Sequence, residues 1–176
     1  MKATLAGGCF WCTEAIFKRL RGVSSVTPGY TGGKVEDPSY EQVCSSATGH
    51  AEAIEIEFDP SVISYETLLE VFFHLHDPTT LNQQGADHGT QYRSAIFYHN
   101  EDQKKTTQKV MKKLESDEAF KNPIVTTIEP ADTFYPADES HRDYYAKNSS
   151  QGYCQYTIDP KIQKLSSDYK PLLKDE

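Results

Sequence analysis

The sequence lacks the features that place a protein in a membrane or on a nucleic acid. No stretch approaches the roughly 18 apolar residues of a membrane-spanning helix, and the first residues lack the basic segment and apolar run of a secretory signal. The net charge of -8 argues against nucleic acid or an anionic membrane surface as the main partner. We therefore expect a cytoplasmic protein that binds neither membranes nor nucleic acids.

The sequence also lacks the glycine-rich motifs that bind nucleotide cofactors. It contains no G-x-G-x-x-G fingerprint, no P-loop and no internal repeat. With 176 residues, of which 37% are hydrophobic, the chain has the size and composition of one globular domain. We expect a monomer with a single domain over residues 1–176 and no cofactor.

Cysteine is scarce, with four residues in the chain. A chain of this length buries about two-thirds of its unfolded surface, so it needs no disulfides to fold. In a reducing cytosol, cysteines are more often catalytic or metal-binding than structural. The four thiols, Cys9, Cys12, Cys44 and Cys154, are therefore candidates for chemistry.

Hydrophobic periodicity predicts alternating strands and helices. Residues 52–60 alternate between apolar and acidic side chains, which is typical of a half-buried strand. After the capping residue Ser64, apolar residues recur at i, i+3, i+4 and i+7 from Tyr65, so a helix is predicted up to Asp77. The other predicted strands cover 2–7, 23–33, 93–99 and 124–130, and the other predicted helices cover 10–21, 101–119 and 138–147.

This order of elements predicts the fold class. Two successive β-α-β units followed by α-β-α predict an α+β sandwich, with helices on one face of a mainly antiparallel sheet. Two polar stretches, 34–51 and 79–92, are predicted as long loops, which often carry function. After Gly152 the periodicity fades, and we expect a long irregular C-terminal tail over about 153–176.

Cys9 is the sharpest chemical feature of the sequence. It follows a predicted strand and a Gly-Gly turn, and it lies where a helix begins. Exposed backbone N–H groups and the positive end of the helix dipole favour a thiolate there. The adjacent Phe10 and Trp11 could line a small apolar pocket beside this nucleophile. The alternative is that Cys9 is an inert buried residue and that both rings belong to the core.

The predicted loops add polar groups that could converge on the same end of the sheet. Glu52 opens a strand that is otherwise built for burial, and a buried carboxyl can act as a general acid. Its neighbour His50 could be a base or a metal ligand, but a lone histidine is more often structural. The further candidates from these loops are Tyr40, Asp87, His88 and Tyr92.

Two other interpretations of the cysteines remain open from the residues alone. Cys9-x-x-Cys12 after a strand resembles a thioredoxin-like redox pair, although the parallel βαβ pattern expected downstream is missing. Together with Cys44 and His50 the pair could bind zinc, but structural zinc normally uses two short ligand pairs.

Several segments together resemble the methionine sulfoxide reductase A family. These are "GGCFWCTEAIF", "GYTGG", "DPSYEQVCSSATGHAE", "FDPSVISYETLLEVFFHLHDPT", "QGADHGTQYRSAIFY" and "GYCQ". They run in order and at natural spacing from about residue 7 to about residue 154. The resemblance implies a ferredoxin-like α+β sandwich and reduction of the S-epimer of methionine sulfoxide, free or in proteins, with no metal.

The resemblance also implies residue roles. Cys9 matches the nucleophile that attacks the sulfoxide sulfur and is left as a sulfenic acid. Glu52 matches the acid that protonates the sulfoxide oxygen, and Tyr40 and Tyr92 match hydroxyls that hydrogen-bond it. Phe10 and Trp11 match the rings that hold the substrate methyl group. Asp87 matches a residue near the polar end of the substrate, and His88 follows Asp87 in the sequence.

The second half of the reaction needs another thiol. The sulfenic acid condenses with it to a disulfide, which an external reductant, thioredoxin in the family, must open. We expect Cys154, in "GYCQ", to be this resolving thiol. Cys12 is the alternative, because i and i+3 are neighbours on a helix. The chain departs from the family pattern here, since Cys12 stands where glycine is frequent and a second C-terminal cysteine is missing. Cys44 is expected to be a structural loop thiol.

Overall fold

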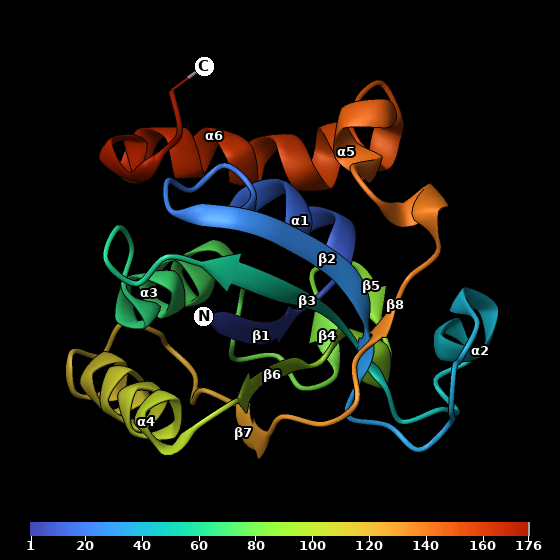
Figure 1. Cartoon of the computed structure of the whole chain (residues 1–176), viewed down its shortest axis with the longest axis horizontal. Coiled ribbons are helices and arrows are strands. Elements are labelled where there is room, and N and C mark those ends of the chain that lie inside the picture. The colour runs from blue at the N-terminus through green and yellow to red at the C-terminus, as the bar shows by residue number, and fades with distance from the viewer. Residues whose placement is uncertain (176) are drawn as a thin grey trace.

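A six-stranded sheet forms the centre of the molecule in the computed structural model, which describes residues 1–175 (Figure 1). The strands lie in the order β7-β6-β1-β3-β2-β8, and all neighbours are antiparallel except β6 and β7. The strands are β1 (Lys2–Gly7), β2 (Val23–Thr31), β3 (Ala51–Phe58), β6 (Ser94–Tyr98), β7 (Thr127–Pro130) and β8 (Tyr135–Pro136).

Two helices make the crossovers that define the topology. Helix α1 (Phe10–Phe17) joins β1 to β2, and α3 (Tyr65–Leu75) joins β3 to β6. Both β1 and β2 run antiparallel to β3, which lies between them, so the central order β6-β1-β3-β2 is that of a split β-α-β pair. The predicted ferredoxin-like α+β sandwich with a mainly antiparallel sheet is confirmed.

The remaining elements are short apart from two helices. They are α2 (Tyr40–Cys44), α4 (Glu101–Ser116), α5 (Tyr144–Lys147), α6 (Asp159–Asp168), the hairpin β4 (Gln83–Gln84) and β5 (Asp87–His88), the 3-10 turns Thr90–Tyr92, Glu139–His141 and Lys170–Leu172, and a π-helical turn at Cys154–Ile158. Within residues 1–175 no helix has both the length and the apolar character needed to cross a bilayer.

The two faces of the sheet are packed differently. Leu5, Ile54 and Ile56 project from alternate strand positions into one large core with α1, α3 and α6. The opposite face carries small residues such as Ala6 and Ala53. Phe134, directly before β8, packs there, because a Cβ atom at Gly29 would lie 2.5 Å from its ring. The helices therefore cover one face, as the sequence predicts.

The prediction of an unstructured loop over 34–51 is wrong, because α2 forms within it. Ser39 caps this helix: its hydroxyl accepts the N–H of Gln42 at 3.1 Å, and the Gln42 side chain accepts the N–H of Ser39 at 2.8 Å. This is a reciprocal capping box. The S-x-x-Q signal was present, but only Val43 of the helix is buried, so hydrophobic periodicity could not reveal it.

The expected irregular C-terminal tail is also wrong. Residues 154–168 form a continuous helical segment that lies along α1 (Figure 1). Cys154, Ile158 and Leu165 are fully buried. Ile162 is partly buried and packs against both the main core and the cluster that contains Cys154. These residues follow helical spacing, but the lysines between them lower the mean hydropathy and hid the pattern.

Smaller differences concern element ends. The first helix ends at Phe17 instead of residue 21, and its chain then turns through Gly22 with φ of +93°. The helix predicted over 138–147 is two pieces, a 3-10 turn and α5, separated by Asp143 in a left-handed conformation.

Candidate active site

Cys9 lies at the start of α1, directly after the turn made by Gly7 and Gly8. A Cβ atom at Gly7 would lie 2.8 Å from the Phe72 ring, and one at Gly8 would lie 2.6 Å from the Gln84 side chain. Gly8 also has φ of +94°, which disfavours other residues. Both glycines are therefore required, and the turn fixes where the Cys9 thiol enters the site.

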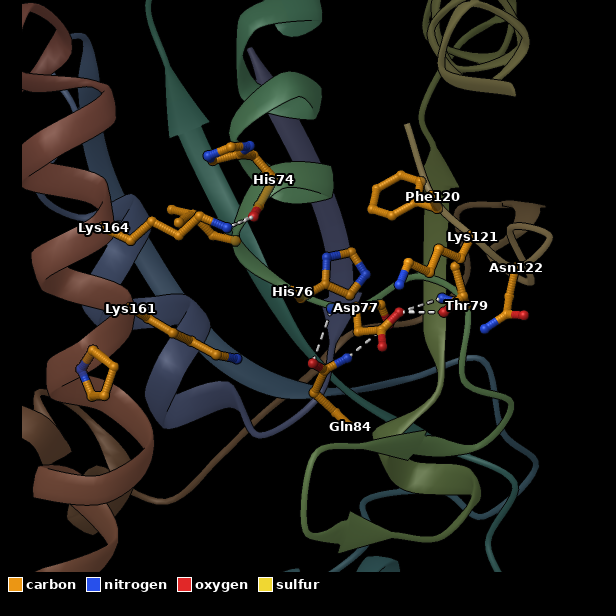
Figure 2. Close-up of a pocket in the computed structure, with 12 residues that line it drawn as sticks. His74, His76, Asp77, Thr79, Gln84, Phe120, Lys121, Asn122, Lys161 and Lys164 are labelled. Carbon is orange, nitrogen blue, oxygen red and sulfur yellow. Dashed lines mark hydrogen bonds between the residues drawn. The ribbon is translucent and has the colours of Figure 1, made fainter. Parts of the chain in front are cut away.

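The groups behind this turn line a cavity of about 570 Å³ (Figure 2). The Gln84 side chain both accepts the N–H of Asp77 at 3.0 Å and donates to its carbonyl oxygen at 2.9 Å. Lys161 of α6 also lines this cavity. Gln84 both lines this cavity and packs against Gly8, and none of the predicted site residues lines the cavity.

Glu52 of β3 is the most unusual group near Cys9. Its side chain is 1% exposed, and Oε1 accepts the backbone N–H of Phe10 at 3.1 Å. The second oxygen, Oε2, is buried without a hydrogen-bond partner among residues 1–175. Burial raises the pKa of Glu52 to about 8, so the carboxyl is protonated at neutral pH. It is a buried acid with a free oxygen.

Two tyrosine hydroxyls share this environment. Tyr40 is the first residue of α2, and Tyr92 ends the 3-10 turn after β5. Burial raises the pKa of both phenols well above the usual value. Both hydroxyls therefore stay neutral and can donate a hydrogen bond at any physiological pH.

Aromatic side chains from distant segments surround Phe10 and Trp11. Phe10 is fully buried, with ring centroids 5.5 Å from Tyr30 and 5.4 Å from His141. Trp11 is half-buried, and its indole N–H donates to Nδ1 of His141 at 3.1 Å. The Tyr144 ring stacks on Trp11 at 3.7 Å with an interplanar angle of 6°. The first turn of α1 thus lies at the centre of an aromatic cluster.

Three of the four thiols cluster together. Cys9, Cys12 and Cys154 are all buried and share one apolar cluster. Burial raises the pKa of the Cys9 thiol, and the neighbouring Cys12 thiol raises it further. Cys9 in turn lowers the pKa of Cys12. Cys44 is exposed and does not belong to this cluster.

Asp87 joins the site through a residue that the sequence did not indicate. Its Oδ2 accepts the hydroxyl of Tyr153 at 2.7 Å, and the same hydroxyl lies 3.9 Å from the Cys12 sulfur. Its neighbour His88 is exposed on β5. The structure therefore connects Asp87 to the thiols, whereas the role of His88 stays a prediction.

Sequence reasoning missed three aromatic residues, His141, Tyr144 and Tyr153. Tyr153 belongs to the "GYCQ" segment, in which only Cys154 is a predicted site residue. His141 and Tyr144 lie in the stretch 138–147, which is predicted as a helix without a functional role. They reach the site only because the chain after β8 folds back over α1. Residue patterns hold no signal for such a return.

The structure assigns His50 a structural place. Its Nδ1 accepts the N–H of Gly33 at 3.0 Å, and its Nε2 lies 2.6 Å from the carbonyl oxygen of Val35. With both ring nitrogens in use, the histidine closes the loop before α2. No group of three His, Cys, Asp or Glu side chains within the described part of the chain could hold a metal ion.

A thiol, a protonated carboxyl and two neutral phenols beside an aromatic cluster are the groups that a thiol-dependent oxidoreductase needs. The comparisons with known proteins agree with this class. The sequence profile of the family described as "Peptide methionine sulfoxide reductase" matches residues 1–172. The chain therefore belongs to the peptide methionine sulfoxide reductase family.

Relatives support this assignment over nearly the whole chain. Peptide methionine sulfoxide reductase MsrA 1 of Rhodopirellula baltica is 55% identical over 172 residues, which are 98% of this chain and 88% of the relative. Peptide methionine sulfoxide reductase MsrA of Sulfolobus acidocaldarius is 54% identical over 167 residues, or 95% of this chain and 94% of the relative.

Solved structures show the same fold. Mxr1 from Saccharomyces cerevisiae in reduced form has a TM-score of 0.79 and 36% identity, and the match covers 88% of each chain. Mxr1 in complex with Trx2 has a TM-score of 0.56 and 28% identity, covering 82% of this chain and 84% of the other.

Proposed function

We propose that this chain is a peptide-methionine (S)-S-oxide reductase that repairs oxidised proteins in the cytoplasm. It acts as a single catalytic domain and takes methionine sulfoxide in peptides and proteins or in free form. The observation that carries the proposal is Glu52, whose buried, unpartnered oxygen and raised pKa supply a proton donor beside Cys9.

The first step transfers oxygen from the sulfoxide to Cys9. The Cys9 sulfur attacks the sulfoxide sulfur while Glu52 gives a proton to the sulfoxide oxygen, which is a poor leaving group unless protonated. The hydroxyl then passes to the Cys9 sulfur as the sulfur–sulfur bond formed by the attack breaks, so Cys9 is left as a sulfenic acid and methionine leaves with the electron pair. The thiol proton of Cys9 passes to the Glu52 carboxylate, which restores the acid. The neutral hydroxyls of Tyr40 and Tyr92 donate hydrogen bonds to the oxygen as charge develops on it.

Substrate orientation comes from the first turn of α1 and from β5. The rings of Phe10 and Trp11 hold the methyl group against an apolar surface. Asp87 and His88 lie toward the polar end of the substrate. The positions of Phe10 and Trp11, directly after the nucleophile on one helical turn, support this assignment.

The second step needs a resolving thiol, and we propose Cys154. Its thiol condenses with the Cys9 sulfenic acid, water leaves, and a disulfide remains. Burial of Cys154 in the same cluster as Cys9 supports this pairing. Cys12 is the alternative, supported by its burial in the same cluster. Thioredoxin then reduces the disulfide, as the complex of the yeast relative with Trx2 suggests.

The function is tested by offering each methionine sulfoxide epimer separately, with dithiothreitol, to wild type and Cys9→Ser. We expect turnover of the S-epimer alone, and none in the variant. Equal turnover of both epimers, or activity that survives in Cys9→Ser, would contradict the proposal.

The resolving thiol is tested by mass spectrometry after one equivalent of substrate. We expect a Cys9–Cys154 disulfide in wild type and an accumulated Cys9 sulfenic acid in Cys154→Ser. A Cys9–Cys12 disulfide in wild type would assign the role to Cys12 instead.

A further inference from the structure

Glu14 of α1 is a buried carboxyl that the proposed reaction does not use. Glu14 is 4% exposed, and this burial raises the pKa of its carboxyl. A carboxyl in such a place destabilises the fold unless hydrogen bonds satisfy it. Oε1 accepts the backbone N–H of Asp143 at 3.0 Å. Glu14 therefore binds the backbone of a segment almost 130 residues away.

The segment that Glu14 binds has an uncommon conformation. Asp143 has φ of 52° and ψ of 34°, in the left-handed region that few residues other than glycine adopt. An exposed ion pair between its side chain and Lys18 contributes little to stability. The partly buried hydrogen bond to the Glu14 carboxyl is thus the stronger local restraint on this turn.

The turn determines where the next ring lies. Tyr144 follows Asp143 and stacks on Trp11 at 3.7 Å, nearly parallel. Its hydroxyl donates to the Gln151 side chain at 2.7 Å, so the ring is held at both ends. Trp11 and Glu14 are three residues apart and lie on the same side of α1. Helix α1 therefore carries both Trp11 and Glu14, the residue that holds the backbone next to Tyr144.

We propose that Glu14 is a positioning residue for substrate binding: by holding the backbone at Asp143, it fixes the ring of the next residue, Tyr144, on Trp11 and so sets the orientation of the indole. The proposal rests on the proposed function for the part Trp11 has in binding the substrate methyl group. Glu14 touches no reacting atom, so its loss affects binding rather than chemistry.

The test compares two variants of similar side-chain volume. Glu14→Met removes the oxygen that accepts the Asp143 N–H, and Glu14→Gln keeps an amide oxygen that can accept it. Trp11 is the only tryptophan in the chain, so its fluorescence reports the stacking directly, without catalysis. For Glu14→Met we expect a shifted Trp11 emission and a KM for methionine sulfoxide raised about 5- to 10-fold, with kcat within about twofold of wild type. Glu14→Gln should resemble wild type in both.

Asp143→Asn is the matched control, because it removes the Lys18 ion pair but keeps the backbone N–H and tolerates the left-handed conformation. It should leave emission and KM unchanged. Wild-type emission or wild-type KM in a folded Glu14→Met would overturn the proposal.

If Glu14→Met does not fold, Glu14→Gln still tests the proposal. A shifted Trp11 emission or KM in Glu14→Gln would refute a role for Glu14 that depends on accepting the Asp143 N–H. The emission readout is independent of activity. A shift in Glu14→Met without any turnover by wild type would leave the positioning intact and reject the proposed function.

Discussion

At the residue scale, Glu52 combines two opposing effects. Burial raises the pKa of Glu52 to about 8, so the carboxyl is an acid at neutral pH. The same burial destabilises the folded protein when the carboxyl ionises. Its hydrogen bond from the Phe10 N–H links the acid to the residue that follows the nucleophile. Acid, nucleophile and pocket are therefore positioned by one short stretch of backbone.

Glu52→Gln should slow oxidation of Cys9 by about 10²- to 10⁴-fold, because the amide cannot supply the proton. The rate is measured in a single turnover without reductant. In wild type the contribution of Glu52 to this rate should be present below pH 8 and lost as the pH rises through about 8. An unchanged rate in Glu52→Gln would exclude Glu52 as the acid.

Glu52→Gln should also stabilise the protein at alkaline pH. In the folded state the pKa is raised above its unfolded value of 4.5, so the unfolded state releases the proton first and stability falls as the pH rises between these values. The penalty in wild type is of the order of a few kcal/mol above pH 8. Urea unfolding at pH 5 and pH 9 should show a smaller loss for the variant; equal losses would contradict the assigned pKa.

At the element scale, α2 presents Tyr40 but contributes little to the core. Only Val43 of its five residues is buried, so its stability depends on the capping box at Ser39. The sequence held this signal in the order Ser39-x-x-Gln42. Periodicity could not support it, because a helix of little more than one turn has too few buried positions.

Ser39→Ala should therefore affect catalysis more than global stability. Loss of the cap costs about 1 kcal/mol and allows α2 to fray, which displaces the Tyr40 hydroxyl. We expect kcat/KM to fall several-fold with little change in the thermal midpoint.

The control is Ser64→Ala at the start of α3, where the hydroxyl also accepts a backbone N–H, from Thr67 at 3.0 Å. Because α3 belongs to the main core, this variant should lower the midpoint and leave kcat/KM nearly unchanged. The reverse pattern in the two variants would show that α2 is not the weaker element.

At the scale of the whole molecule, the C-terminal segment is part of the core as well as of the site. Ile158 and Leu165 are fully buried, and burial of each aliphatic side chain of this kind contributes roughly 2–5 kcal/mol. Total stabilities of domains are only about 5–15 kcal/mol. The segment therefore cannot detach as a free tail without loss of the fold.

Deletion of residues 153–176 should abolish cooperative thermal unfolding, whereas Cys154→Ser should unfold like wild type and still complete one turnover. Calorimetry of the two proteins checks this. A stable, cooperatively folded deletion variant would show that the segment only carries the thiol.

The sequence by itself determined the order of β1, β2, β3, β6 and β7 and of the helices α1, α3 and α4, because each of these elements has its own hydrophobic period. It also determined the contiguous unit Cys9-Phe10-Trp11 at the start of a helix. Tertiary structure alone decided that Glu52 lies against the backbone of Phe10, and that His141, Tyr144 and Tyr153 close the pocket from the other end of the chain. Periodicity reports which way a residue faces within its own element. The convergence of side chains depends on how distant elements pack, and no local pattern encodes that.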